Sequence, residues 1–277
     1  MKKYEDLQFS DDFMFGIVMG DNELCRKFLE RLLQQPVDKL VTPEKQKEIR
    51  MTSDGKSIRL DIYTQEGSSG TVYDAEMQKL GNKKLEDLQL PRRSRYYQSL
   101  IDTDLLVRGN SYKKLKESNV IFICTFDPFE KGLYKYTFSE ECQENKGLLL
   151  EDGTRRIFYN TKSTDPSIPP DVKKLFDYIN TSKATDELTE EIDGAVQKAR
   201  QNSEWGSYYM KSFVHDMEIR EEGREEGRVE GRVEGREEGQ MQMLLELYRE
   251  GTITLDVLKA KTGKSDAQIE EVLENKV

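Results

Sequence analysis

The fold is decided by two alternating stretches of sequence, Ser57-Ile58-Arg59-Leu60-Asp61-Ile62-Tyr63 and Thr71-Val72-Tyr73-Asp74-Ala75-Glu76-Met77-Gln78. In both, apolar residues occupy every second position, which is the period of a β-strand with one buried face. The segment between them, Gln65-Glu66-Gly67-Ser68-Ser69-Gly70, is rich in turn-forming residues. The two stretches therefore predict an antiparallel hairpin.

Alternation assigns each side chain of the hairpin to one of two faces. We expect one face in the core, with Ile58, Leu60, Ile62, Tyr73, Ala75 and Met77. The other face carries Arg59, Asp61, Tyr63, Asp74, Glu76 and Gln78. A register symmetric about the turn pairs Asp61 with Asp74 and places Glu76 on the diagonal, roughly 7–8 Å away at the backbone. Two carboxylates at that separation can reach one cation.

Acidic side chains crowded on one strand face repel one another, and a divalent cation relieves that repulsion. Mg²⁺ suits such a site because it prefers oxygen ligands and keeps several waters. It can also lower the pKa of a bound water and neutralise charge on a scissile phosphate. The same spacing fits an ordinary solvent-facing strand face, so the residues alone leave both interpretations open.

Further elements are expected around the hairpin. Apolar spacing predicts a helix over residues 9–35, capped by Ser10 and Asp11 and broken near Gly20-Asp21-Asn22. Strands are expected at Glu48–Thr52, Asn119–Phe126, Leu133–Phe138 and Thr154–Asn160. Helices are expected from Asn82 to Leu106 with a bend at Pro91, from Asp171 to Asn180, and from Asp186 into the tail. This order predicts a mixed α/β domain.

Composition excludes several kinds of site. The single histidine, His215, cannot build a multi-histidine zinc site, and no G-x-S-x-G motif is present for a serine hydrolase. Three cysteines without a CxxC pair argue against a zinc or disulfide framework. Leu258 stands where a P-loop would need its first glycine. What remains for catalysis is carboxylates with a hard metal ion.

The apolar segments of the sequence predict where in the cell the protein is located. The first residues lead into no apolar signal core, and the longest apolar run, Val120 to Phe126, is too short to span a bilayer. We therefore expect a soluble, cytoplasmic protein with no membrane segment.

Charge is unevenly distributed along the chain. The net charge is −10, yet Lys79 to Lys116 contains ten Lys or Arg against four Asp or Glu. This local excess follows the hairpin directly, so it favours contact with phosphates near the acidic face. The expected DNA-binding residues are Arg92, Arg93, Arg95, Tyr97 and Gln98.

Several of these motifs together resemble a known family. Asp61, a hairpin turn, Glu76-Met77-Gln78 and a later Arg95-Tyr96-Tyr97-Gln98 are similar to the PD-(D/E)XK nuclease superfamily, and more narrowly to the recombination-promoting nucleases, also described as transposases of this fold. The similarity includes Phe9-Ser10-Asp11-Asp12-Phe13-Met14-Phe15 and the Glu-Gly-Arg tail. It implies a restriction-endonuclease-like mixed sheet flanked by helices, with a C-terminal helical extension.

The resemblance also implies an activity and its residues. It implies a Mg²⁺-dependent DNA endonuclease that promotes recombination or transposition-like events, with Mn²⁺ or Ca²⁺ as other candidate ions. Asp61 and Glu76 would bind the metal, and the carbonyl of Met77 would complete the protein ligands. Gln78 occupies the usual place of a lysine and would orient a water, while Lys79 is expected to point to the opposite face. The alternative is a catalytically inactive subunit that kept the nuclease fold and binds DNA or protein through its tail.

The acidic pair Asp11 and Asp12 has two interpretations. Both residues stand at the expected start of the first helix, where they are good caps. They could equally add a carboxylate to the metal site.

The whole chain divides into three predicted parts, with residues 1–215 as the nuclease-like domain, 216–239 as a Glu-Gly-Arg linker or helix, and 240–277 as a small helical module. Glycine recurs every four residues from Gly223 to Gly235, and each helical glycine costs about 1 kcal/mol relative to alanine. We therefore expect a marginal helix, acting either as a solvated linker or, because rows of glycine allow close approach, in self-association.

The last module holds three helical patterns, Met241–Arg249, Leu255–Lys261 and Asp266–Glu274. Together they resemble a small helix-turn-helix unit. The third pattern carries four acidic residues, which disfavours DNA contact. Oligomerisation or partner docking is the favoured interpretation.

Overall fold

One mixed β-sheet organises the N-terminal part of the chain. The computed structural model describes residues 2–41, 44–49, 58–106 and 111–263. Its strands are β1 (Glu44–Ile49), β2 (Ile58–Gln65), β3 (Val72–Gln78), β4 (Ser118–Cys124), β5 (Lys135–Phe138) and β6 (Thr154–Asn160), in the order β1-β2-β3-β4-β6-β5. The β3–β4 and β4–β6 pairs are parallel and the other pairs are antiparallel. The predicted α/β class is confirmed.

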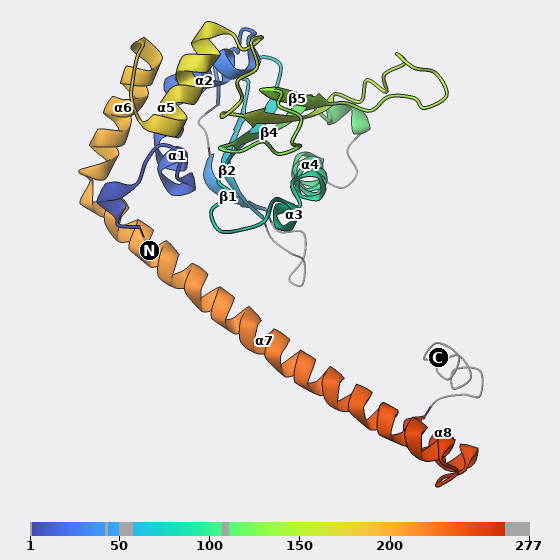
Figure 1. Ribbon diagram of the computed structural model, residues 1–277. Helices are drawn as coiled ribbons and strands as arrows, with labels where there is room; N and C mark the ends of the chain where they lie inside the picture. Colours follow the sequence, from blue (N-terminus) through green and yellow to red (C-terminus); the bar gives the residue numbers. More distant parts are fainter. Residues whose placement is uncertain (1, 42–43, 50–57, 107–110, 264–277) are drawn as a thin grey trace. The chain divides into compact units, whose positions relative to one another are not determined.

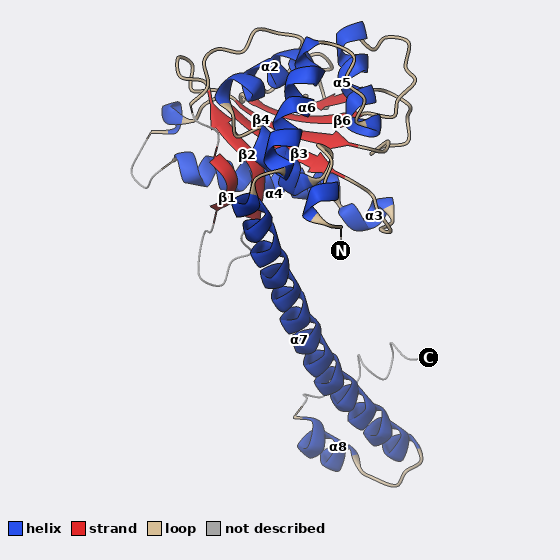
Figure 2. Ribbon diagram, turned by 90° about the vertical axis from the view of Figure 1, so that its left-hand side faces the viewer, coloured by secondary structure: helices blue, strands red, loops and turns tan. Residues whose placement is uncertain are grey.

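Helices cover both faces of this sheet (Figures 1 and 2). The α-helices that the structure describes are α1 (Asp12–Val18), α2 (Asn22–Leu33), α3 (Leu85–Leu88), α4 (Leu90–Leu105), α5 (Pro170–Thr181), α6 (Glu187–Arg200), α7 (Ser203–Arg249) and α8 (Leu255–Thr262). One core cluster joins a sheet face to α1, α2, α5 and α6, and a second joins the opposite face to α4. Because both faces are covered, all seven residues of β4 are buried, as its continuous apolar run predicts.

Local capping explains where the predicted helices are interrupted. The helix expected over residues 9–35 is two helices, and the Asp21 carboxylate caps the second by accepting from the N–H groups of Glu23 and Leu24. The basic helix breaks at Gln89, whose φ of 46° is left-handed, and Pro91 lies in the first turn of α4. The helix expected from Asp186 is likewise interrupted, between α6 and α7.

Strand boundaries agree less well at the sheet edge. β6 has its predicted bounds, whereas β1 begins four residues before the predicted Glu48. The remainder of that predicted strand, and the side chains of Ile58 and Arg59, lie outside the described residues.

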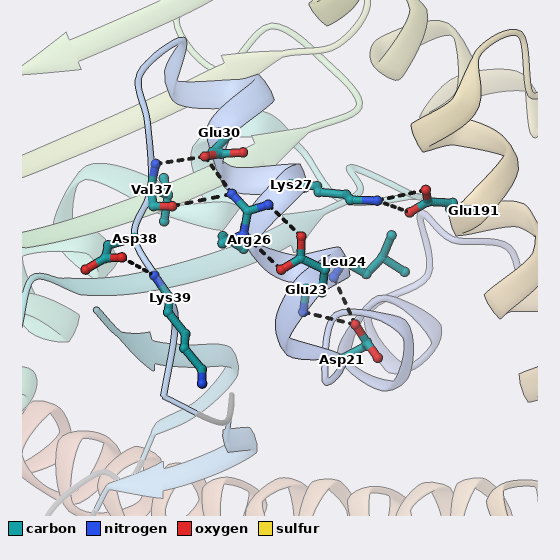
Figure 3. Close-up of polar contacts among 10 residues, drawn as sticks. All are labelled: Asp21, Glu23, Leu24, Arg26, Lys27, Glu30, Val37, Asp38, Lys39 and Glu191. Carbon is teal, nitrogen blue, oxygen red and sulfur yellow. Dashed lines mark hydrogen bonds and ion pairs between the residues drawn. The ribbon is translucent and has the colours of Figure 1, made fainter. Parts of the chain in front are cut away.

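Polar contacts fix α2 beside α6 (Figure 3). Arg26 bridges Glu23 and Glu30 on its own helix, and its Nη1 lies 3.5 Å from the carbonyl of Val37. Lys27 Nζ lies 2.8 Å from both carboxylate oxygens of Glu191 on α6. Such half-exposed pairs each contribute about 0–1 kcal/mol, so the buried apolar faces provide most of the stability.

α7 is helical through the entire Glu-Gly-Arg repeat, for which either a linker or a helix was expected. Nucleation is the costly step of helix formation, while propagation adds one hydrogen bond for each residue fixed. At the start of α7, Trp205 and Tyr209 pack against the first core, which stabilises the nucleus. Near its other end, Leu245 packs with Leu258 of α8. Helical turns anchored in this way can extend through the glycines.

The chain divides into two compact units, Met1–Tyr209 and Met210–Val277. In the second unit α8 matches the predicted second helical pattern, and it ends at Gly263 in a left-handed conformation. The third pattern, Asp266–Glu274, lies outside the described residues. Among the residues described, none of the helices combines the length and apolar character needed to cross a bilayer.

Candidate active site

A cavity of about 400 Å³ opens where β2 and β3 separate. Five parts of the chain contribute to its lining. They supply Asp61 from β2, Glu76, Met77 and Gln78 from β3, Ser10, Asp11 and Asp12 from the start of α1, Lys79, Lys83 and Leu88 from the segment after β3, and Arg93 and Tyr97 from α4. The structure therefore brings the predicted catalytic residues into one cavity.

The carboxylates of Asp61 and Glu76 accept hydrogen bonds that join β2 to β3 beyond the point where their backbone pairing ends. The ladder runs from Gln65–Val72 to Ile62–Ala75. Beyond it, the N–H of Asp61 donates to Glu76 Oε1 at 2.8 Å, and the N–H of Met77 donates to Asp61 Oδ2 at 2.9 Å. Each carboxylate thus satisfies a backbone group that lost its ladder partner.

The predicted register was wrong by two residues. Tyr63, and not Asp61, pairs with Asp74, so continuing the ladder sets Asp61 opposite Glu76 and closer than the predicted diagonal. A shift of two leaves the paired residues of the ladder on their predicted faces. Leu60 is an exception, because it lies before the ladder and packs in the α4-side cluster while Ile62 packs in the other.

Two buried carboxyl groups, Asp74 and Glu76, and the half-buried Asp61 make the site electrostatically costly. Asp74 is 0% exposed and Glu76 is 2% exposed, which excludes a solvent-facing strand face. Burial, with added repulsion between neighbouring carboxylates, raises the pKa of Asp61, Asp74 and Glu76 well above ordinary values. Both carboxyl oxygens of Asp74 are buried and have no hydrogen-bond partner among the described residues.

A divalent cation fits this donor set. The desolvated carboxylates supply hard oxygen ligands, and a bound cation would offset their mutual repulsion. In the part of the chain that the structure describes, no group of three or more Asp, Glu, His or Cys side chains is arranged around a common point. Mg²⁺ is commonly held by one or two carboxylates with several waters, so Asp61 and Glu76 suffice as its acidic ligands.

Arg93 enters the cavity from α4 and contacts the hairpin. Its Nη1 donates to Gln78 Oε1 and its Nη2 to the hydroxyl of Tyr97, both at 2.9 Å. Nη2 also lies 3.7 Å from Glu76 Oε2. Loss of solvation raises the pKa values of Asp61, Asp74 and Glu76 by more than the charge of Arg93 lowers them.

Asp11 and Asp12 at the start of α1 differ in their partners. Asp11 accepts from Lys79 Nζ at 2.7 Å and from Lys2 Nζ at 2.5 Å. Burial alone would raise the pKa of Asp11, but these hydrogen bonds outweigh it and the pKa is lowered. Asp12 is exposed, and its charge adds to the raised pKa of Asp61 and Glu76. Asp12 is therefore the α1 carboxylate that acts electrostatically on the site.

Lys79 lines the cavity, so the expectation that it points to the opposite face is wrong. Strand alternation applies only within a strand, and β3 ends at Gln78. Lys83, which the sequence did not single out, lines the same cavity. The sequence feature that could have identified Lys83 is the local excess of positive charge directly after the hairpin.

The five predicted DNA-binding residues separate according to their position on α4. Arg92 and Arg95 are exposed, while Arg93 reaches into the cavity. Tyr97 is 7% exposed and Gln98 is 8% exposed. The Gln98 amide donates to Ser118 and Asp102 inside the protein. Gln98 therefore supports α4 from within, while the buried Tyr97 lines the cavity and accepts a hydrogen bond from Arg93.

Comparison with known proteins identifies the family. No curated protein and no solved structure matches the chain. A family model described as PD-(D/E)XK nuclease family transposase matches residues 5–162, more than half of the chain. The match includes the hairpin, α4 and β4, and the mixed sheet flanked by helices agrees with the PD-(D/E)XK fold. The chain therefore belongs to the PD-(D/E)XK nuclease family of transposases.

Proposed function

We propose that the protein is a metal-dependent DNA endonuclease that hydrolyses phosphodiester bonds in the cavity at the end of the β2–β3 hairpin. One observation carries the proposal. The half-buried Asp61 and the buried Glu76 line one cavity with Lys79, Lys83 and Arg93, and both carboxyls have raised pKa values. Such clusters of perturbed groups in a cleft are typical of active sites.

Asp61 and Glu76 would hold the cation, with the carbonyl of Met77 as a further ligand. When bound, Mg²⁺ supplies a lowered pKa for water and charge neutralisation at the phosphate, and Mn²⁺ or Ca²⁺ are the other candidate ions. Gln78 lies beside this pair and can hold a water or phosphate oxygen by hydrogen bonding. Lys79 and Lys83 are placed to attract the DNA backbone.

Exposed cations on α4 extend this interface. Arg92 and Arg95 are exposed on the helix that borders the cavity, and we assign them to phosphates flanking the cleaved bond. Tyr97 contributes to the interface indirectly, because its hydroxyl accepts a hydrogen bond from Arg93 and helps to hold that side chain in place. Cleavage in this way would promote recombination or transposition-like events, and we place it in the cytoplasm.

The tail adds a proposal about assembly. Four glycines of the repeat in α7 have free space around them. A Cβ added at Gly227, Gly231, Gly235 or Gly239 would meet no atom of the described residues within 4 Å. Glycines spaced by four permit two helices to approach closely. We propose that residues 216–239 associate with a second copy and that the helical module of residues 240–277 reinforces the contact.

One observation favours a second function. Gln78 carries no charge, and Asp61 and Glu76 each use one oxygen on a backbone N–H. A chain in which these contacts are purely structural would be a nuclease-fold subunit that binds DNA or protein without cutting.

Plasmid cleavage decides between the two functions. Supercoiled plasmid is incubated with Mg²⁺ or Mn²⁺ and wild type, Asp61→Ala or Glu76→Ala, and Asp177→Ala serves as an exposed carboxylate control on α5. We expect nicking by wild type and the control, and nicking at background level by the two cavity variants. Equal nicking by all four proteins, or none by wild type, would reject the nuclease and favour the binding subunit.

A further inference from the structure

Arg93 is held in a fixed place by aromatic residues. Its guanidinium carbon lies 5.4 Å from the ring centroids of both Tyr97 and Phe122, within the range of a cation–π interaction. The Tyr97 hydroxyl accepts from Nη2, and the side chain is only 31% exposed. These contacts restrict the rotamers of Arg93, so its remaining donors point in defined directions.

The contact between Arg93 and Gln78 fixes the orientation of an amide. A guanidinium carries donors and no acceptor, so the Gln78 atom that faces Arg93 Nη1 at 2.9 Å must be the carbonyl oxygen. The amide N–H₂ is then turned away from Arg93. Gln78 lines the cavity, and among the residues described its N–H₂ donates to no protein acceptor. Its free donors are therefore available to a molecule in the cavity.

An oriented donor backed by positive charge is suited to hydrolysis of a phosphate diester. Negative charge grows on phosphoryl oxygens during the reaction, and fixed donors aimed at such oxygens stabilise the transition state. Gln78 has the donor without the charge, whereas Arg93 has the charge. Polarisation of the Gln78 carbonyl by Arg93 makes the amide N–H₂ a stronger donor, as in other chains of hydrogen bonds.

Arg93 already uses two of its five N–H donors on side chains of the protein and lies within ion-pair distance of Glu76. Nη1 is used on Gln78, and Nη2 is used on Tyr97 and lies 3.7 Å from Glu76. Arg92 and Arg95, by contrast, are exposed. We propose that Arg93 is a positioning residue, which fixes the Gln78 amide with its N–H₂ toward the reacting phosphate or water and does not itself bind the DNA backbone. The proposal rests on the nuclease function proposed above.

The effect of Arg93 on the reaction rate is tested by comparing two single variants with the double variant. We expect Arg93→Met and Gln78→Met each to lower the single-turnover nicking rate on the order of 100-fold. If Arg93 acts through Gln78, the double variant should be no more than about threefold slower than the slower single variant. A product of the two losses, on the order of 10⁴-fold, would mean a direct contact of Arg93 with DNA and would overturn the proposal.

A structural measurement separates this inference from the nuclease proposal. In metal-free protein, the ¹⁵N relaxation of the Gln78 side-chain amide, assigned by its loss in Gln78→Met, should match the rigid backbone. Arg93→Met should make it mobile, Arg93→Lys should restore part of the rigidity, and Lys174→Met on α5 should change nothing. An amide that stays rigid in Arg93→Met would refute the positioning role. A mobilised amide in a protein that never cuts DNA would reject the nuclease alone and leave the contact established.

Discussion

Asp74 gives the sharpest test of the electrostatics of the site. It is fully buried beside Glu76, both its oxygens have no hydrogen-bond partner among the described residues, and burial raises its pKa well above 3.8. Asp74→Asn keeps the size of the side chain and removes the charge. We therefore expect the metal-free variant to be more stable than wild type near pH 8 by more than about 1.4 kcal/mol, the free energy of a tenfold change in proton affinity.

The sign of the pH dependence follows from proton binding. Because the folded protein binds the Asp74 proton more tightly than the unfolded chain, its contribution to stability is complete below the ordinary value of 3.8. That contribution is lost as the pH rises through the raised pKa, with a slope of up to about 1.36 kcal/mol per pH unit for one proton. Asn does not titrate, so the advantage of the variant should grow with pH and then level off.

Urea denaturation in EDTA at pH 5, 6, 7, 8 and 9 measures this difference. Asp177→Asn, an exposed carboxyl on α5, should stay within about 0.5 kcal/mol of wild type throughout. A stability difference for Asp74→Asn that is independent of pH, or that shrinks as the pH rises, would show that Asp74 is not a buried carboxyl with a raised pKa.

Two further predictions concern glycines in helices. Gly194→Ala on α6, where an added Cβ meets nothing within 4 Å, should stabilise the protein by about 1 kcal/mol in thermal denaturation. Gly206→Ala places a Cβ 3.2 Å from the ring of Tyr4, so the same measurement should show a smaller gain or a loss of stability. Gly231→Ala in α7 should increase helicity by circular dichroism and, if glycine rows form the contact between copies, lower the mass measured by light scattering; an unchanged mass would reject self-association through this face.

The sequence was sufficient to identify the hairpin and its acidic face. Strand alternation and turn chemistry are local properties, and they placed Asp61, Asp74, Glu76 and Gln78 together before any long-range contact was known. The pairing register depends on how the two strands fit the turn and the next helix, and the assumption of symmetry about the turn missed it by two residues.

Long-range packing explains the remaining differences. Tyr97 and Gln98 follow three arginines in a basic segment, and only the fold shows that they face Phe122 and Ser118 of β4. Lys79 reaches the cavity because β3 ends one residue earlier. The helicity of α7 depends on packing at its ends, which propensities summed along the Glu-Gly-Arg repeat do not contain.

The charge that weakens the metal-free protein also strengthens cation binding, so Asp74→Asn should shift the two properties in opposite directions. Asp74 does not line the cavity, yet its charge raises the pKa of Glu76, and Asp61 likewise acts on Asp74. Removing it lowers the repulsion that a divalent cation would relieve. Calorimetric titration with Mn²⁺ at pH 8 should therefore show weaker binding by the more stable variant. Unchanged Mn²⁺ affinity together with increased stability would mean that the Asp74 charge only destabilises the folded protein and does not contribute to cation binding.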